Sequence, residues 1–106
     1  MMNFSDHLKT LPGVESLHSL RLFDQEKNMI AVLENKAGQA GSLAVYHHLF
    51  QKFGAITPSA AQKGLDLYAE HTDDARQHPK KHPNIDRLFA IIDQNATLDV
   101  ELVYIQ

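Results

Sequence analysis

The chain has 106 residues, 43% of them hydrophobic and 22% charged, and its formal net charge is −3. This composition is typical of a globular protein, and the length predicts a single domain over residues 1–106 with a core of its own. The negative charge argues against nucleic-acid binding, which needs a positive field. Without cysteine the chain has no disulfide, thiolate ligand or cysteine nucleophile. No apolar run approaches the roughly 18 residues of a membrane span, so we expect no membrane partner and a cytoplasmic location.

The first third of the sequence predicts a short helix and then a β-hairpin. Either Asn3 or Ser5 caps the helix, and Pro12-Gly13 ends it. Apolar and polar residues nearly alternate over Val14–Phe23, which is typical of a strand, and Met29–Leu33 is a continuous apolar run. We therefore expect an antiparallel hairpin whose second strand is the more buried.

The middle of the sequence predicts two helices. Ser42 is expected to cap a helix that runs to about Phe53 and is apolar on two sides. A threonine before proline is a common helix start, so Thr57 and Pro58 predict a long helix that ends at Arg76 or Gln77. Its expected buried stripe is Ala61, Leu65, Tyr68, Thr72 and Ala75.

The last quarter of the sequence predicts one more helix, capped by Asn84, and a strand over the alternating segment Leu98 to Ile105. The order of elements is then α-β-β-α-α-α-β. Strands at both ends of a chain with helices between them indicate an α+β two-layer sandwich. We expect a small, at least partly antiparallel sheet, formed by the hairpin and the C-terminal strand and covered by three to four helices.

Histidines and carboxylates are concentrated between Glu70 and Asp86. His71 and Asp74 are three residues apart and so project to one side of the predicted helix, where His78 joins them if the last turn stays helical. His82 can approach from the following loop. Such a set suits a divalent metal such as Zn²⁺, Mn²⁺ or Ni²⁺ as cofactor. The spacing matches no metal motif, and structural roles at a helix end explain the same residues.

A glycine-containing loop with Lys36, Gly38 and Gly41 leads into the helix at Ser42. Backbone N–H groups at a helix start attract phosphate or carboxylate, so these residues, with Arg76, are candidate contacts for a small anionic ligand. The spacing is neither that of a Walker motif nor that of a dinucleotide fingerprint. Turn geometry and helix capping are the alternative explanation for this loop.

His47 lies in the middle of an apolar helix face. The first interpretation is a core histidine whose N–H is satisfied by a neighbour, because a buried polar group needs a partner. The second is a general base in a pocket, near Glu34, Tyr46 or Tyr68. The sequence leaves both open.

Three strings resemble a bacterial protein family catalogued as domain of unknown function 2322. They are G-S-L-A-V-Y-H at Gly41 to His47, A-E-H-T-D-D-A-R at Ala69 to Arg76, and H-P-K-K-H-P-N-I-D-R-L at His78 to Leu88. The resemblance covers nearly the whole chain and implies a bacterial, single-domain protein. It implies no activity, so no catalytic residue can be carried over.

The function that these patterns favour is a small binding or regulatory domain. It would recognise a protein partner or a small anion through the loop from Lys36 to Ser42 and the segment from His71 to Asn84. The alternative is a divalent-metal-dependent hydrolase that uses the His71, Asp74 and His78 cluster. A homodimer through the uncovered sheet face or its edge strand is a further prediction, motivated by Val103 and Ile105. Whether the protein is an enzyme stays open.

Overall fold

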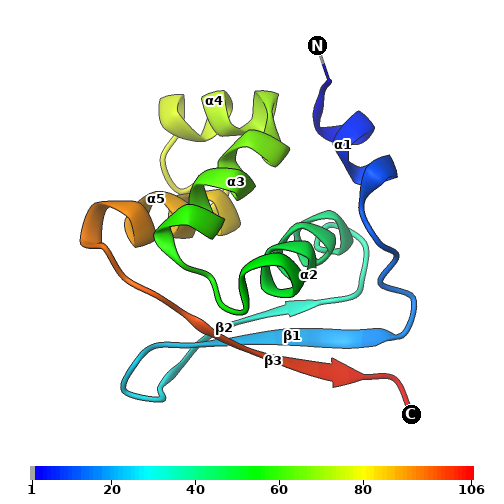
Figure 1. Cartoon of the computed structure of the whole chain (residues 1–106). Helices are drawn as coiled ribbons and strands as arrows, with labels where there is room; N and C mark the ends of the chain where they lie inside the picture. Colours follow the sequence, from blue (N-terminus) through cyan, green and yellow to red (C-terminus); the bar gives the residue numbers. More distant parts are fainter. Residues whose placement is uncertain (1) are drawn as a thin grey trace.

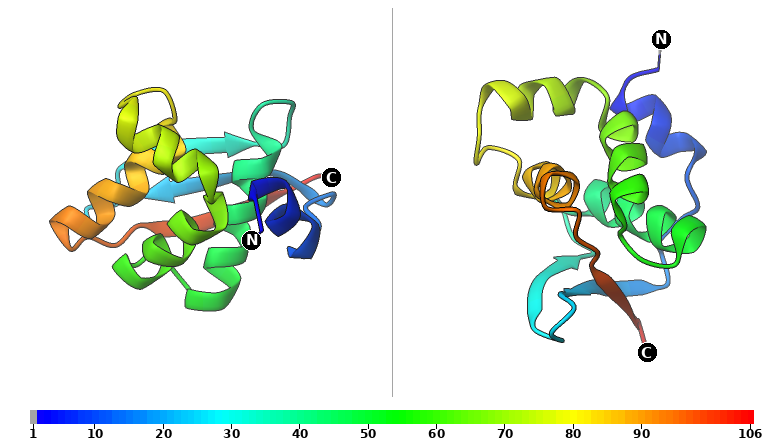
Figure 2. Two further views of the ribbon diagram at one scale, coloured as in Figure 1. Left: turned by 90° about the horizontal axis from the view of Figure 1, so that it is seen from above. Right: turned by 60° about the vertical axis from the view of Figure 1, so that its left-hand side comes forward.

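The structure, a computed structural model, describes residues 2–106, in which five helices and three strands are formed. The elements are α1 (Phe4–Thr10), β1 (Leu17–Phe23), β2 (Met29–Glu34), α2 (Ala40–Phe53), α3 (Pro58–Tyr68), α4 (Glu70–Gln77), α5 (Pro83–Gln94) and β3 (Asp99–Tyr104). All the helices lie on one face of the sheet (Figures 1 and 2). The predicted α+β two-layer architecture is therefore confirmed, with the order α-β-β-α-α-α-α-β and one more helix than expected.

The sheet is antiparallel with the strand order β2-β1-β3, so the C-terminal strand pairs with the first strand of the hairpin. Leu20 on β1 faces Leu33 on one side and Leu102 on the other. The central strand buries Leu17, Leu20 and Leu22, whereas β2 exposes Met29, Ile30 and Val32. The expectation that the second hairpin strand is the more buried was wrong, because the pairing of β3 with β1 leaves β2 at the edge.

Helix α2 lies on the sheet against β1 and β2, and α3 packs against its other side (Figure 1). Its buried residues are Leu43, Val45, Tyr46, His47 and Leu49, which confirms a helix buried on two sides. The helix begins at Ala40 with Gln39 as its N-cap. Ser42 was therefore wrongly predicted as the cap, and its hydroxyl instead accepts a hydrogen bond of 2.7 Å from the Tyr68 hydroxyl.

The predicted long helix is divided at Ala69 into α3 and α4. Ala69 has φ 52° and ψ −117°, a conformation that residues other than glycine rarely adopt. Thr57 caps α3 as expected, and its hydroxyl accepts a hydrogen bond from the Ala60 amide. The expected stripe is buried on both helices, at Ala61, Leu65, Tyr68, Thr72 and Ala75. Apolar spacing predicted which side is buried but gave no sign of the break, because alanine itself favours helix.

The structure also settles the N-caps of α1, which the sequence left open, and of α5, which it misplaced. Asn3 caps α1, and its side chain and that of Asp6 each accept a hydrogen bond from the other's backbone amide. Helix α5 begins at Pro83, with His82 as the N-cap, so the prediction of Asn84 as the cap was wrong. Proline is favoured at the first helical position because its missing N–H has no partner there in any case. Asn84 lies one residue further in, where its side-chain oxygen accepts a hydrogen bond of 2.8 Å from Arg87.

Gly64 is the position at which α3 comes closest to its neighbours. A Cβ at Gly64 would lie 2.7 Å from Cδ1 of Leu88 on α5 and 3.0 Å from Cδ1 of Leu49 on α2. Both leucines are fully buried. The missing side chain therefore lets three helices pack together above the sheet.

Replacing Gly64 by valine should destabilise the protein by roughly 1–3 kcal/mol, because overpacked cores must shift their side chains or backbone. Urea unfolding of Gly64→Val against the natural protein measures this change. Ser59→Val, at an exposed position of the same helix, should change the free energy of unfolding by about 0.5 kcal/mol or less. Equal effects of the two substitutions would contradict the close approach at Gly64.

Candidate functional site

The break at Ala69 deprives carbonyl groups at the end of α3 of the amide partners that a continuous helix supplies. The Thr72 hydroxyl donates a hydrogen bond of 2.6 Å to the Leu65 carbonyl. The Leu67 carbonyl lies 2.9 Å from Nδ1 of His7. Because a carbonyl oxygen can only accept, His7 carries a proton on Nδ1 in this bond. One side chain from α4 and one from α1 thus supply hydrogen bonds to the carbonyl groups that the break leaves without amide partners.

Glu70, the first residue of α4, links the start of α1 to the junction of α3 and α4. Its Oε1 accepts a hydrogen bond of 2.8 Å from the Phe4 amide, and this bond lowers the pKa of the Glu70 carboxyl. The Phe4 ring stacks on the Tyr68 ring, with their centroids 5.2 Å apart. Helix α1 is therefore fixed against the junction of α3 and α4, although the two parts are far apart in the sequence.

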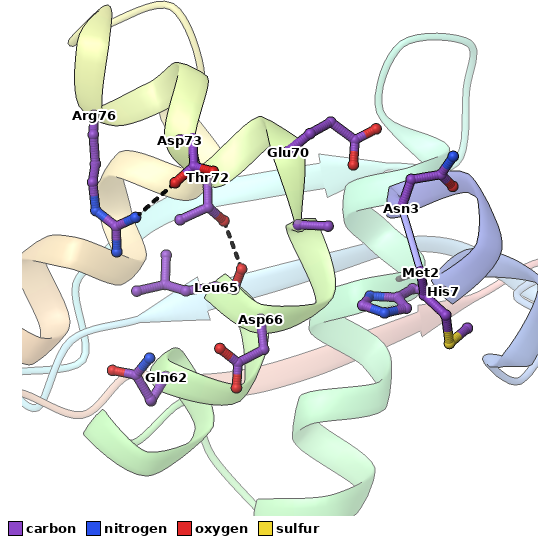
Figure 3. Close-up of a pocket in the computed structure, with 11 residues that line it drawn as sticks. Met2, Asn3, His7, Gln62, Leu65, Asp66, Glu70, Thr72, Asp73 and Arg76 are labelled. Atoms are coloured by element: carbon purple, nitrogen blue, oxygen red, sulfur yellow. Dashed lines mark hydrogen bonds and ion pairs between the residues drawn. The ribbon is translucent and has the colours of Figure 1, made fainter.

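A cleft of about 670 Å³ lies between α1, α3 and α4 (Figure 3). Leu65, Ala69 and Met2 supply apolar surface to its lining. The polar part of the lining includes one imidazole, one guanidinium and three carboxylates, from His7, Arg76, Asp66, Glu70 and Asp73. A cavity that combines apolar surface with a few convergent polar groups is the usual form of a binding site.

The charge of this cleft is negative. Asp66 comes from α3 and Glu70 and Asp73 come from α4, so the acidic side chains lie on both sides of the junction, and all three residues are exposed. Arg76 supplies the opposing charge, but its Nη1 already lies 3.1 Å from Oδ1 of Asp73 (Figure 3). One carboxylate is thereby neutralised and two remain, so the cleft is suited to a positively charged group.

A second hollow, of about 450 Å³, lies between the end of α4 and α5. Phe89, Ala75 and Pro79 give it an apolar lining, and Asp93 stands among its polar residues. Arg76 lines this hollow as well as the cleft, and its guanidinium carbon lies 5.2 Å from the centre of the Phe89 ring. The two depressions are therefore adjacent and share one side chain.

The residues predicted to hold a metal gather around Asp74, with a lysine among them. His82 Nε2 lies 2.7 Å and Lys81 Nζ 2.9 Å from Oδ2 of Asp74, and His78 Nε2 lies 3.8 Å from Oδ1. The His71 ring stands beside the His82 ring, 5.6 Å between centroids, and not against the carboxylate. Within residues 2–106 no three histidine or carboxylate side chains are grouped as metal ligands. The cluster is a network around Asp74 that consists of the Lys81 ion pair and the His82 hydrogen bond, and metal binding by it stays a prediction.

The network lowers the pKa of the Asp74 carboxyl. Hydrogen bonds from His82 first, and then from Lys81, lower the pKa of the Asp74 carboxyl from 3.8 to about 2. Both donors follow the end of α4, so the carboxylate fastens the α4–α5 connection to the helix. This agrees with the loop-organising role that the sequence left open for these residues.

The candidate anion contacts are dispersed among other interactions. Lys36 pairs with Glu34 at 3.4 Å, and Gly38 occupies a turn at φ 88°. A Cβ at Gly41 would lie 3.3 Å from the Phe4 ring, and the Ser42 hydroxyl is bonded to Tyr68. Arg76 contacts Asp73 on α4 and Phe89 on α5, away from this loop. Anion binding by the loop stays a prediction.

His47 is buried, with 8% of its surface exposed, and burial lowers its pKa. The interpretation of His47 as a buried core residue is therefore confirmed. The expected hydrogen-bond partner is missing at Nδ1, which is buried without one among residues 2–106. The Tyr46 and Tyr68 hydroxyls donate elsewhere, to the Asn84 carbonyl and to Ser42. Both tyrosines named beside the possible general base are thus engaged in other bonds, and Glu34, the third residue named there, pairs with Lys36.

Sequence reasoning did not predict the cleft, and of the residues in its lining it named only Arg76 as a candidate binding contact. A signal was present, since Asp66, Glu70 and Asp73 are spaced four and three residues apart, the interval at which side chains share a helix face. The wall formed by α1 gave no such signal, because periodicity within a helix does not say where that helix packs.

Thr72→Val should cost about 1–3 kcal/mol of stability, because it leaves the buried Leu65 carbonyl without its donor while keeping the shape of the side chain. Urea unfolding measures this. Thr10→Val removes an exposed hydroxyl that bonds the His7 carbonyl and serves as the matched control, with an expected effect of about 0.5 kcal/mol or less. If Thr72→Val were as mild as the control, the hydroxyl would not hold the break.

The Asp74 network should contribute stability that depends on pH. Because folding lowers this pKa from 3.8 to about 2, the contribution is complete above about pH 3.8 and is lost as the pH falls towards 2. Asp74→Asn should therefore lower stability at neutral pH, with a difference from the natural protein that shrinks in this window. Carboxyl ¹³C titration should give a midpoint near 2, moved towards 3.8 by His82→Phe. A natural midpoint near 3.8 would contradict the network.

Comparison with known proteins identifies a family for this chain. The family described as an uncharacterized protein conserved in bacteria, DUF2322, matches residues 4–102. No curated protein and no solved structure matches the chain. In the structure of residues 2–106, no helix has the length and apolar character needed to cross a membrane. The match runs from the first residue of α1 into β3 and so includes the whole cleft except its Met2 and Asn3 edge, and the chain belongs to the bacterial DUF2322 family.

Proposed function

We propose that this protein is a binding domain that recognises a positively charged segment of a partner protein. The observation that carries the proposal is the acidic, partly apolar cleft of about 670 Å³ between α1, α3 and α4. A cleft of this volume can admit one long side chain together with the backbone around it. The sequence favoured a binding domain on other grounds, and the cleft supports the same proposal.

The charge of the cleft supports a cationic group over an anion. An arginine or lysine entering it would meet the exposed carboxylate of Asp66 and the second oxygen of Glu70, whose first oxygen holds the Phe4 amide. A phosphate or carboxylate in the cleft would be repelled by the negative charge of the same two carboxylates. The aliphatic stem of an arginine or lysine also suits the apolar surface of Leu65 and Ala69.

The walls of the cleft are held by hydrogen bonds before any ligand arrives. His7 bonds the end of α3, Glu70 bonds the start of α1, and Thr72 bonds across the break. A site built on fixed helices loses little conformational entropy when it binds. This rigidity supports recognition of a flexible partner segment, which must itself be ordered on binding.

The hydrolase alternative receives no comparable support. The Lys81 ammonium lies on the same oxygen of Asp74 as His82 does, and a divalent cation would have to displace it. We therefore do not propose metal-dependent hydrolysis at this cluster.

The proposal predicts charge-selective peptide binding. In an NMR titration of ¹⁵N-labelled protein with the peptides Gly-Leu-X-Leu-Gly, X as arginine or lysine should shift the amides that line the cleft. Glutamine at X should bind more weakly, and glutamate should not bind. Asp66→Asn should weaken binding of the arginine peptide by roughly three- to tenfold, the effect of losing one partly desolvated charge contact.

Glu15→Gln is the matched control, because it changes the net charge equally at an exposed residue outside the cleft lining. It should leave the affinity unchanged. Equal binding of the glutamate and arginine peptides, or shifts confined to another face of the molecule, would overturn the proposal.

A further inference from the structure

Arg76 stands where the two hollows of the helical layer meet. It lines the cleft between α1, α3 and α4 and also the hollow between α4 and α5. Its guanidinium lies 3.1 Å from the Asp73 carboxylate and faces the Phe89 ring at 5.2 Å. A carboxylate and an aromatic face together form a binding position for a cation, and in this structure the protein's own arginine occupies it.

The contacts that hold Arg76 there are easily exchanged. The side chains of Arg76 and Asp73 are 57% and 75% exposed. Exposed ion pairs and exposed cation–π contacts each contribute little net free energy, since water screens them and the side chain loses rotamer freedom. Another guanidinium or ammonium can therefore replace Arg76 at small cost, and the freed side chain can extend into solvent.

We propose that Arg76 acts as a built-in competitor, which fills the cation position in the free protein and is displaced by an arginine or lysine of the partner. The inference rests on the proposed function and adds that Arg76 occupies the cation position while no partner is bound. Displacement would open a continuous path from the cleft to the second hollow. There the apolar surface of Phe89 and Pro79 would receive the partner's neighbouring apolar residue, beside the exposed carboxylate of Asp93.

The charges of this path define the partner. Asp66, Glu70 and Asp73 line the cleft, and Asp93 lies in the second hollow. Arg76 is the basic residue that lines both, and removing it from the path leaves the acidic groups facing the ligand. The matching occupant is an extended segment of a protein in which a cationic side chain precedes or follows an apolar one.

The test compares the natural protein with Arg76→Ala in the NMR titration with Gly-Leu-Arg-Leu-Gly. Because the variant lacks the competitor and one repulsive charge, it should bind the peptide roughly three- to tenfold more tightly. Arg21→Ala is the matched control, since it removes an equally charged, exposed arginine that pairs with Glu101 on the sheet. That control should leave the affinity unchanged.

A second pair of variants tests the position itself. In the Arg76→Ala background, Asp73→Asn or Phe89→Leu should abolish most of the gain in peptide affinity. The first removes the carboxylate of the cation position and the second removes its aromatic ring, and each keeps a similar side-chain volume. Thermal unfolding monitored by circular dichroism confirms that each variant is folded before it is titrated.

The outcomes separate this inference from the proposed function. If the natural protein binds the arginine peptide and Arg76→Ala binds it equally or more weakly, the competitor is disproved and the binding function stands. If neither protein binds the peptide, both proposals fail. A gain in Arg76→Ala that Arg21→Ala matches would show a general charge effect and would also overturn the inference.

Discussion

At Ala69 the backbone leaves the helical region, and α4 turns away from α3 (Figure 1). A non-glycine residue at φ 52° and ψ −117° costs on the order of 1–3 kcal/mol, so it persists only where its surroundings determine it. The surroundings here are the Thr72 hydroxyl on the Leu65 carbonyl and the His7 ring on the Leu67 carbonyl. A continuous helix would have satisfied these carbonyls with its own amides and would have placed α4 elsewhere.

The cleft follows from this turn. Because α4 leaves the axis of α3, Glu70 can reach the Phe4 amide and hold α1 as the third wall. The same turn sets the acidic side chains of both helices around one depression and brings Arg76 to the Phe89 ring on α5. Local strain, the position of α1 and the charge of the cleft are thus parts of a single arrangement, and the proposed recognition of a cationic segment depends on all of it.

The sequence was sufficient for the architecture and for contacts between near neighbours. Helical spacing put His78 on the side of Asp74, and His82 reaches Asp74 from the following loop, as the sequence allowed. Nothing in the spacing gave a reason to expect that Lys81 would share the same carboxylate. It also could not tell the central strand from the edge strand, since that depends on pairing with β3, far along the chain. The break at Ala69 could not be predicted for a different reason. Alanine favours helix, and tertiary contacts that the local sequence does not show impose the break. The cleft needed that break and the docking of α1, so only Arg76 was predicted as a binding residue among those that line it.

NMR assignment of residues 65–73 is the most direct test of the turn at Ala69. We expect helical chemical shifts on both sides of Ala69, an interruption at Ala69 itself, and the strong intraresidue contact between amide and α protons that a positive φ produces. We also expect a contact between the His7 ring and the end of α3, because the ring bonds the Leu67 carbonyl. Unbroken helical shifts from Pro58 to Gln77 would contradict the turn, and the cleft with it.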